Sequence, residues 1–376
     1  MAKLTLKEVS KSYAGPDRQD VSAITNISLE VADGEFLAVT GAAGSGKSTL
    51  VRLIAGLEPV SHGEIFLAER RLDDAPAKDR DLAFVMAGGG LYPHMTVEQN
   101  LAFGLKLRRF AKGEIKKRVR ETGDVLGITD LLARHPLSLP LEQRQRVAIG
   151  RAIVRQPKVF LFDDPLAGLD EVARTKLRTE IARLHQRLEA TVLYATGDPT
   201  EAIALGDRIA LLKAGELQQT DTSAGRCAAP ANSYVASFFG NPPMNILRGT
   251  LKQERDTLLF SEADDGTVEV RFVGSDHVAW KALVGLPMLL GVRPEDIQVV
   301  PSGTDKGRVG AGFPAIVDVV EPDSSGANLH LQTGAHDVVC RSPVILDRSE
   351  AGRRRRFTID PMKVHLFDAV SGERLS

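Results

Sequence analysis

Apolar positions in the first two thirds of the chain follow two different periods, which predict short buried strands and amphipathic helices. Helical spacing predicts mostly helical structure over residues 96–156 and helices over Glu171–Leu188 and Thr200–Leu205. Strands that alternate with helices indicate an α/β fold with a parallel sheet. The runs predicted as buried strands are Leu4–Val9, Ile27–Val31, Glu35–Thr40, Leu82–Met86, Val159–Phe162, Thr191–Ala195 and Arg208–Leu212.

The pattern changes near Asn241-Pro242-Pro243, where helical spacing largely ends. We therefore expect an α/β domain over residues 1–240, with a helical subdomain at about 88–156, and a second domain over residues 241–376. Short strands at regular spacing predict that the second domain is a small β-barrel. Its predicted strands are Thr267–Phe272, Met288–Val292, Ala315–Val320, Asn328–Gln332, Val338–Arg341 and Lys363–Phe367.

A glycine-rich loop lies between the strand that ends at Thr40 and an apolar helix start. The run Gly41-Ala42-Ala43-Gly44-Ser45-Gly46-Lys47-Ser48-Thr49 reads G-x-x-x-x-G-K-S-T, the phosphate-binding P-loop. Glycines let the backbone fold around phosphates, so that N–H groups and the helix N-terminus point at the anion. We expect Lys47 to reach the β- and γ-phosphates of a nucleoside triphosphate and Ser48 to bind Mg²⁺. A simple glycine turn is the alternative, which the complete motif disfavours.

Two other features accompany this loop. Tyr13 lies upstream of it, where its ring could stack on a purine or, equally, pack in the core. The predicted strand Val159–Phe162 runs directly into the carboxylates Asp163 and Asp164. The residues predicted to bind the nucleotide are Tyr13, Gly41, Gly44, Ser45, Gly46, Lys47, Ser48 and Thr49.

Composition and charge narrow the possible partners. A formal net charge of −1 gives no sign of a nucleic-acid partner, so none is expected. The one dense basic run, Arg353–Arg356, is predicted as a solvated turn. Cys227 and Cys340 form no metal-binding spacing and no disulfide framework, which fits a cytosolic compartment.

The sequence contains no predicted membrane span. The N-terminal residues alternate like a strand and lack the apolar region of a signal peptide. The longest apolar stretch, Ala282–Val292, contains Pro287 and is too short to cross a bilayer. Any role at a membrane is therefore expected to come through partner proteins.

Six further segments give the chain a family resemblance over nearly its whole length. Together with the P-loop they are a highly specific combination. They are Ile54–Glu58, Leu91–Val97, Gln143–Ala152, Phe162–Asp170, Asn241–Asn245 and Gly291–Asp296. With these motifs the chain resembles the ATP-binding-cassette ATPases, specifically the subunits of maltose- and polyol-type importers.

The resemblance implies a P-loop ABC ATPase domain followed by an oligonucleotide-binding-like barrel. In this family two ATPase subunits sandwich two ATP molecules, each between one P-loop and the signature motif of the other subunit, and closure drives a membrane channel. The resemblance also implies the cofactors ATP and Mg²⁺, with Ser48 and Asp163 as metal ligands and Asp164 at the position of the catalytic base.

The sequence departs from the family pattern at three catalytic positions. A Gln is expected before the Tyr-Pro-His segment, but Ala87 stands there, followed by three glycines that make the loop easy to deform. The catalytic Glu is replaced by Asp164, which is shorter by one methylene, so we expect at most a weak base. The switch His is replaced by Gly197, which has no side chain to contact a phosphate.

The signature motif also departs from the family pattern. Leu-Ser-Gly-Gly-Gln is expected, and the aligned residues are Leu139-Pro140-Leu141-Glu142-Gln143. Pro140 supplies neither a hydroxyl nor an N–H for the phosphate, and Glu142 places a carboxylate near it. Both residues suit an ordinary helix start, with Pro at the first position and an acid in the first turn.

These features predict a degenerate ATP-binding subunit of an importer for a small polyol or sugar such as glycerol. The expected partners are an unlike ABC ATPase subunit, two transmembrane permease subunits and a solute-binding protein, with the chain on the cytoplasmic side of the bacterial inner membrane. Two alternatives remain: a non-hydrolysing regulatory subunit that senses ATP, and a cassette protein that acts without a membrane domain.

Overall fold

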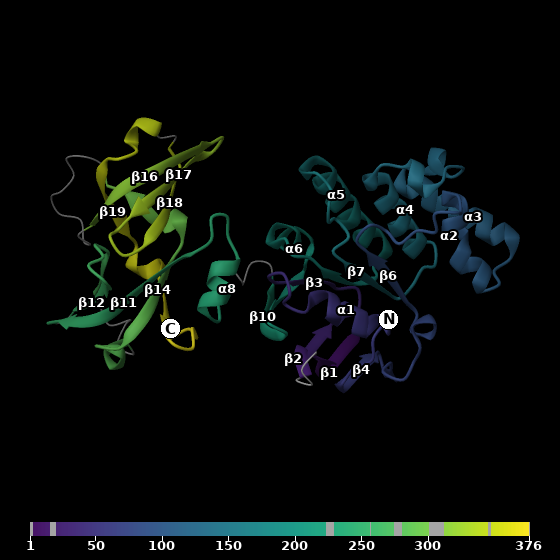
Figure 1. Cartoon of the computed structure of the whole chain (residues 1–376), viewed down its shortest axis with the longest axis horizontal. Helices are drawn as coiled ribbons and strands as arrows, with labels where there is room; N and C mark the ends of the chain where they lie inside the picture. The colour runs from purple at the N-terminus through teal and green to yellow at the C-terminus, as the bar shows by residue number, and fades with distance from the viewer. Residues whose placement is uncertain are drawn as a thin grey trace. The chain divides into compact units, whose positions relative to one another are not determined.

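The computed structural model describes residues 3–15, 20–222, 229–255, 257–273, 280–300, 312–344 and 347–375. By its internal contacts the chain divides into two compact units, Met1–Gly225 and Arg226–Ser376. Cys227 lies outside the described residues. Figure 1 traces the chain from the N-terminal strands to the C-terminal sheets.

A six-stranded sheet forms the centre of the first unit, in the order β10-β9-β3-β8-β7-β6. Its five strands from β9 to β6 are parallel to their neighbours, and β10 adds an antiparallel edge. This confirms the predicted α/β fold. The strands are β3 (Phe36–Thr40), β6 (Leu82–Met86), β7 (Val159–Asp163), β8 (Thr191–Ala195), β9 (Arg208–Lys213) and β10 (Glu216–Thr222).

A second, antiparallel sheet of the first unit has the order β2-β1-β4-β5. Strands β1 and β2 are longer than the sequence runs predicted, because irregular pairing at Val9 and Lys11 lets them continue past their apolar segments. The strands are β1 (Leu4–Ala14), β2 (Asp20–Val31), β4 (His62–Leu67) and β5 (Arg70–Arg71).

Helices follow most strands of the central sheet, and α2, α3 and α4 group together beside it (Figure 1). Local signals fix their starts: Thr96 and Gln99 form a capping box at α2, and Asp170 caps α5 by accepting the Ala173 N–H. The prediction of mostly helical structure over residues 96–156 is confirmed. The helices are α1 (Lys47–Ala55), α2 (Val97–Leu107), α3 (Lys112–Leu126), α4 (Leu141–Ile153), α5 (Glu171–Leu188) and α6 (Pro199–Leu205).

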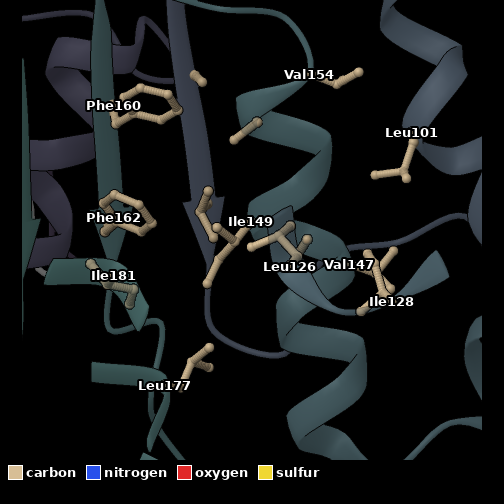
Figure 2. Close-up of a cluster of buried hydrophobic side chains, with 14 of the residues drawn as sticks. Leu101, Leu126, Ile128, Val147, Ile149, Val154, Phe160, Phe162, Leu177 and Ile181 are labelled. Carbon is tan, nitrogen blue, oxygen red and sulfur yellow. The ribbon is translucent and has the colours of Figure 1, made fainter. Parts of the chain in front are cut away.

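Alternate side chains of strand β7 enter two different hydrophobic clusters. Phe160 and Phe162 face the cluster formed with the helices, and Leu161 faces the cluster formed with α1 and the antiparallel sheet. Figure 2 shows both Phe rings projecting from the strand on the side of Ile149. Burial on both faces is typical of a central parallel strand, and it holds the carboxyl end of β7 in a fixed place.

The second unit consists of two five-stranded sheets, in the orders β13-β12-β11-β14-β20 and β15-β19-β16-β17-β18. Side chains from both sheets share one hydrophobic core. The strands are β11 (Asn245–Glu254), β12 (Thr257–Glu262), β13 (Glu269–Val273), β14 (Pro287–Val292), β15 (Ile297–Val299), β16 (Phe313–Asp323), β17 (Gly326–Gln332), β18 (Asp337–Ser342), β19 (Arg354–Ile359) and β20 (His365–Asp368).

The basic run in this unit was predicted as a solvated turn, and the turn is wrong although Arg353, Arg354 and Arg356 are exposed. Residues Arg354–Arg356 begin strand β19, where they pair with the first residues of β16. Arg353 and Arg355 both form ion pairs with the Glu350 carboxylate, at 2.9 and 2.6 Å. Strand pairing and these ion pairs stabilise a segment that its charge alone would leave as a loop.

Helix α8 (Ser233–Phe238) belongs to the second unit. Ala236 on this helix packs in a small buried cluster with Met244 and Phe367 of the β-sheet region. The division between the compact units therefore falls earlier in the chain than Asn241, where the composition changes.

His365 gives the second unit a predicted dependence on pH. Burial and the neighbouring Arg374 and Arg293 lower the pKa of His365 from 6.5 to about 4, so the folded state holds the neutral ring. The stability from this difference is complete above pH 6.5 and is lost as pH falls toward 4. As pH falls across this window, we expect the free energy of unfolding of His365→Gln to decrease by about 1–2 kcal/mol less than that of the wild type, after allowing for solvent screening. Urea unfolding at pH 7 and pH 4.5 measures this free energy in both proteins. An equal decrease in the wild type and in His365→Gln would contradict the prediction.

Candidate functional site

Apart from Tyr13 on the antiparallel strand β1, the predicted site residues lie at or after the carboxyl ends of neighbouring parallel strands. Strands β3, β8, β7 and β6 are adjacent in the central sheet, so their carboxyl ends share one edge. The Asp164 N–H donates to the Ala195 carbonyl at 2.9 Å, and the Ala87 N–H donates to the Asp163 carbonyl at 3.0 Å. These bonds bring the two carboxylates beside the segments that contain Ala87 and Gly197.

The glycine loop has backbone conformations that other residues rarely adopt. Gly41 has φ +151°, and a Cβ there would lie 2.3 Å from the Leu212 carbonyl oxygen. Gly44 and Gly46 have φ +76° and +100°, and Gly46 stands at the N-terminus of α1. No side chain caps this helix and no acidic residue lies in its first turn. The helix N-terminus therefore fits an anion such as a phosphate.

Lys47 turns its ammonium group back over the glycine loop. Its Nζ donates to the carbonyls of Gly41 and Ala42, at 2.7 and 2.9 Å, and to the Ser45 hydroxyl at 3.3 Å. Partial burial lowers the pKa of Lys47, while the nearby Asp164 and Asp163 oppose this shift. The cation is therefore already held at the position where the loop would receive phosphates.

Ser48 and Asp163 form an oxygen pair suited to a divalent cation. The Ser48 hydroxyl donates to Asp163 Oδ1 at 2.6 Å, and Arg52 Nε lies 3.8 Å from the other carboxylate oxygen. Among the described residues, no group of three or more His, Cys, Asp or Glu side chains could hold a metal ion. Mg²⁺ needs no such group, because it takes one or two protein oxygens together with substrate phosphates and water.

Tyr13 lies near the end of strand β1 and is 40% exposed, so the alternative of core packing is wrong. Its hydroxyl donates to the Glu58 carboxylate, and Lys11 Nζ lies 4.9 Å from the centre of its ring. Burial and the Glu58 carboxylate raise the pKa of Tyr13, and a hydrogen bond with Thr49 of helix α1 opposes this shift. Tyr13 and the helix that follows the glycine loop therefore lie close together.

Asp164 adopts a left-handed conformation with φ +48° directly after strand β7. Asp tolerates this conformation better than most residues do. Burial and the neighbouring Asp163 raise the pKa of Asp164, and Lys47 and Arg174 lower it. The carboxylate is thus among the charged groups of the site, but its side chain is short for a general base.

The segment after strand β8 contains a buried carboxylate that the sequence reading missed. Glu201 is 2% exposed, and its Oε2 accepts hydrogen bonds from Tyr194 at 3.0 Å and Thr196 at 2.9 Å. Arg174 Nε lies 3.7 Å from Glu201 Oε1, and its Nη1 lies 3.7 Å from Asp198. Helix α5 is thereby joined to the segment that contains the switch position.

The loop at Ala87 has three consecutive glycines, Gly88, Gly89 and Gly90, with φ +70°, +82° and +53°. Arg151 of helix α4 donates to the Gly90 carbonyl at 2.7 Å and to the Gly89 carbonyl at 3.2 Å. The loop therefore keeps its place between strand β6 and the helical segments, while the side chain at residue 87 is only a methyl group.

Comparison with known proteins decides the family. The sequence matches the ABC transporter family over residues 24–167 and the MalK OB fold domain over residues 240–297. YurJ, an uncharacterized ABC transporter ATP-binding protein of Bacillus subtilis (strain 168), is 42% identical over 376 residues, which cover 99% of both chains. The chain belongs to the ABC transporter ATP-binding proteins. By family it is therefore a transport ATPase that binds ATP.

Two other similar proteins agree with this assignment. The sn-glycerol-3-phosphate import ATP-binding protein UgpC of Cupriavidus pinatubonensis is 40% identical over an alignment of 387 residues, which covers 100% of both chains. A dimeric ATP-binding cassette, MJ0796, in a post-hydrolysis state bound to ADP and Pi, has a TM-score of 0.54 and 29% identity, and covers 58% of this chain and 98% of its own. The predicted resemblance, with a cassette followed by an OB-like domain, is confirmed.

The signature segment of this ABC protein starts helix α4 differently from the prediction. Pro140 has φ −56° and ψ 158°, so it is the N-cap, and the first helical residue is Leu141. The prediction of Pro at the first helical position was therefore wrong, because ψ is extended there. Glu142 does lie in the first turn, where it pairs with Arg146 at 2.8 Å and lies 3.8 Å from Lys176.

The part of the chain that the structure describes contains no helix both long and apolar enough to cross a bilayer.

Four residues beside the site were missed from the sequence. They are charged groups on helices or loops: Glu201, Arg174, Arg52 and Glu58. One local signal was available for Glu201: it follows the predicted buried strand Thr191–Ala195 by six residues and lies in the first turn of an apolar helix.

Proposed function

We propose that this chain is the degenerate ATP-binding half of an ABC importer that contains a second, unlike ATPase subunit. One observation carries the proposal: the Lys47–Ser48–Asp163 arrangement is complete, whereas the neighbouring catalytic positions carry Ala87, Asp164 and Gly197. Such a site binds ATP with Mg²⁺ on Ser48 and Asp163 and hydrolyses it slowly.

The altered residues at the catalytic positions should affect ATP hydrolysis more than ATP binding. The loop, the α1 N-terminus and Lys47 need no help from Ala87 or Gly197 to hold phosphates. A general base, in contrast, must reach its water within hydrogen-bond distance, and a displacement of about 1 Å can lower the rate roughly 10²-fold. Asp164 lacks one methylene of the expected Glu, so turnover should suffer more than affinity.

An unlike partner would relieve the defects of the signature segment. If each ATP lies between one P-loop and the signature of the other subunit, a homodimer would contain every departure in both sites. Glu142 pairs with Arg146 and lies near Lys176, and Pro140 supplies no N–H, so this segment offers little to a phosphate. A partner with a complete signature and base would leave one site able to turn over.

One relative supports a small polar solute. The name of UgpC describes import of sn-glycerol-3-phosphate by that protein. We propose that the present chain energises uptake of a polyol or sugar such as glycerol, together with two permease subunits and a solute-binding protein. In such a complex the chain would lie on the cytoplasmic side of the bacterial inner membrane.

A groove of about 730 Å³ beside the Ala87 loop supports a contact with the permease. Tyr92 and the 69% exposed Leu107 line it, together with Arg108 and Arg155. Gly90 of the Ala87 loop lines the groove, and so does Arg151, which donates to the Gly90 carbonyl; an occupant would therefore contact this loop directly. An apolar and basic groove suits a permease segment that carries apolar and acidic side chains.

A regulatory subunit that senses ATP is the second candidate function. The same weak base and missing switch histidine favour it, because a sensor needs binding without turnover. Purification with a permease and a second ATPase would favour the importer, whereas purification with neither would favour the sensor.

ATP binding with little turnover is the expected behaviour of the purified chain. Calorimetry should detect binding of ATP with Mg²⁺, and steady-state hydrolysis should stay well below about 1 s⁻¹, in the low range for enzymes. Lys47→Ala should abolish binding, because it removes the ammonium held against Gly41 and Ala42. Lys106→Ala, on the exposed face of α2, is the matched control. Turnover of 1 s⁻¹ or more by the wild type would sink the prediction.

A further inference from the structure

Strand β1 is attached to the loop that follows helix α1 by a series of hydrogen bonds. The Ser61 N–H donates to the Ser10 carbonyl at 2.9 Å, and the Ser12 N–H donates to the Ser61 hydroxyl at 3.1 Å. Lys11 Nζ donates to the Pro59 carbonyl at 2.9 Å. Residues 58–61 therefore form a fixed support beside the end of β1.

Glu58 is the residue of this support that contacts Tyr13. Glu58 Oε2 accepts the hydrogen bond of the Tyr13 hydroxyl, and Glu58 Oε1 lies 3.9 Å from Arg52 Nη1. Both carboxylate oxygens thus have a polar neighbour, and 23% of the Glu58 side chain is exposed. A carboxylate held from two sides keeps the phenol of Tyr13 in one direction.

Lys11 restrains the Tyr13 ring from a second direction. Its ammonium lies 4.9 Å from the ring centre, as in a cation–π contact, and Lys11 itself is 9% exposed. Tyr13 keeps 40% of its surface exposed although its hydroxyl and ring both have partners. An aromatic ring held in this way loses little conformational entropy when a flat ligand stacks on it.

Arg52 connects this support to the metal-binding end of the site. It lies on helix α1, with Nε 3.8 Å from Asp163 and Nη1 3.9 Å from Glu58. Asp163 in turn accepts a hydrogen bond from the Ser48 hydroxyl. The Tyr13 support and the phosphate-binding loop are therefore two ends of one connected region around α1.

We propose that Glu58 is a positioning residue for nucleotide-base recognition, which holds Tyr13 as a platform for the purine of ATP. The inference rests on the proposed ATP-binding function and adds to it a residue whose main effect is on the base, although Arg52 also joins it to Asp163. Inorganic tripolyphosphate lacks the base, so the ratio of the ATP affinity to the tripolyphosphate affinity isolates the contribution of the platform.

The test measures binding of Mg²⁺–ATP and Mg²⁺–tripolyphosphate to the full chain by calorimetry. Stacking of a base on an aromatic side chain contributes to the free energy of binding. Tyr13→Ala should therefore weaken ATP binding by about 10-fold or more. Glu58→Leu should weaken ATP binding about 3- to 10-fold and leave tripolyphosphate binding unchanged. Glu58→Gln keeps an acceptor for the phenol and should restore most of the ATP affinity. Tyr13→Phe should resemble Glu58→Leu, and combining the two should add nothing.

A control variant separates this role from a general loss of structure. Glu64→Leu removes a partly exposed carboxylate from neighbouring strand β4 and should leave both affinities unchanged. Equal weakening of ATP and tripolyphosphate by Glu58→Leu would overturn the inference, as would full ATP affinity in that variant. Failure of the proposed function is a different result, in which the wild type binds neither ligand.

Discussion

Lys47→Ala is expected to leave ATP hydrolysis by the assembled importer near its normal rate, whereas substitution of the P-loop lysine in the unlike partner should stop it. The physical reason is that, in the proposed pair of unlike subunits, the two sites would contain different defects. The site on Lys47 has the short base Asp164 and Gly197 at the switch position. The opposite site would have the base and histidine of the partner and would face only the altered signature at Pro140 and Glu142.

A missing base and a missing signature act on different steps. General-base catalysis contributes about 10²–10⁴-fold to the chemical step, so its loss lowers the rate directly. Lost signature contacts weaken closure around ATP, which the rest of the subunit interface can offset. ATP on Lys47 would then remain bound as part of that interface.

The measurement is ATPase activity and solute uptake in a reconstituted complex, with each P-loop lysine replaced separately. Lys106→Ala in α2 serves as a surface control for this chain. The proposed asymmetry predicts that Lys47→Ala impairs uptake no more than the partner substitution does. Hydrolysis that persists after loss of the partner lysine alone would show that the Lys47 site turns over, and the asymmetry would then be wrong.

The residues that sequence could predict are those whose role depends on local order. The P-loop reads directly as strand, loop and helix, and the strand Val159–Asp163 ends in its carboxylates wherever the sheet places it. Parallel strands bring their carboxyl ends to one edge of the sheet. The sequence alone therefore predicts that the P-loop and the carboxylates lie close together. The grouping of these two segments was predictable because each follows a parallel strand.

The supports of these residues depend on contacts between distant parts of the chain. Tyr13 meets Glu58 across 45 positions, and Arg174 meets Glu201 across the rest of helix α5 and strand β8. A lone charged residue on a helix gives no signal of its own, because most such residues are solvated. The prediction for strand β19 was wrong for a similar reason, because its pairing with the distant strand β16 outweighs the charge of its arginines.

Restoring the family residues at the Lys47 site is expected to raise its hydrolysis rate at least about 100-fold. The triple variant Ala87→Gln, Asp164→Glu and Gly197→His supplies the base, the amide and the imidazole together. The backbone permits the imidazole, because a Cβ at Gly197 would meet no atom within 4 Å. Asp164 has φ +48°, a conformation that is harder for Glu than for Asp, so part of the gain depends on relaxation there.

The rate is best measured in a complex whose partner lacks its P-loop lysine, because the remaining hydrolysis then comes from the Lys47 site alone. In the proposed complex the partner would also supply a complete signature to that site, so the altered Pro140 segment would not limit it. Asp164→Glu by itself should give a smaller gain than the triple variant, since the missing histidine still leaves one side of the phosphate without a contact. Asp164→Asn is the matched control, and it should lower the residual rate. A triple variant that still binds ATP and hydrolyses it no faster than the parent would show that Ala87, Asp164 and Gly197 are not what holds the reaction back. The slow step would then lie in closure of the two subunits around the nucleotide.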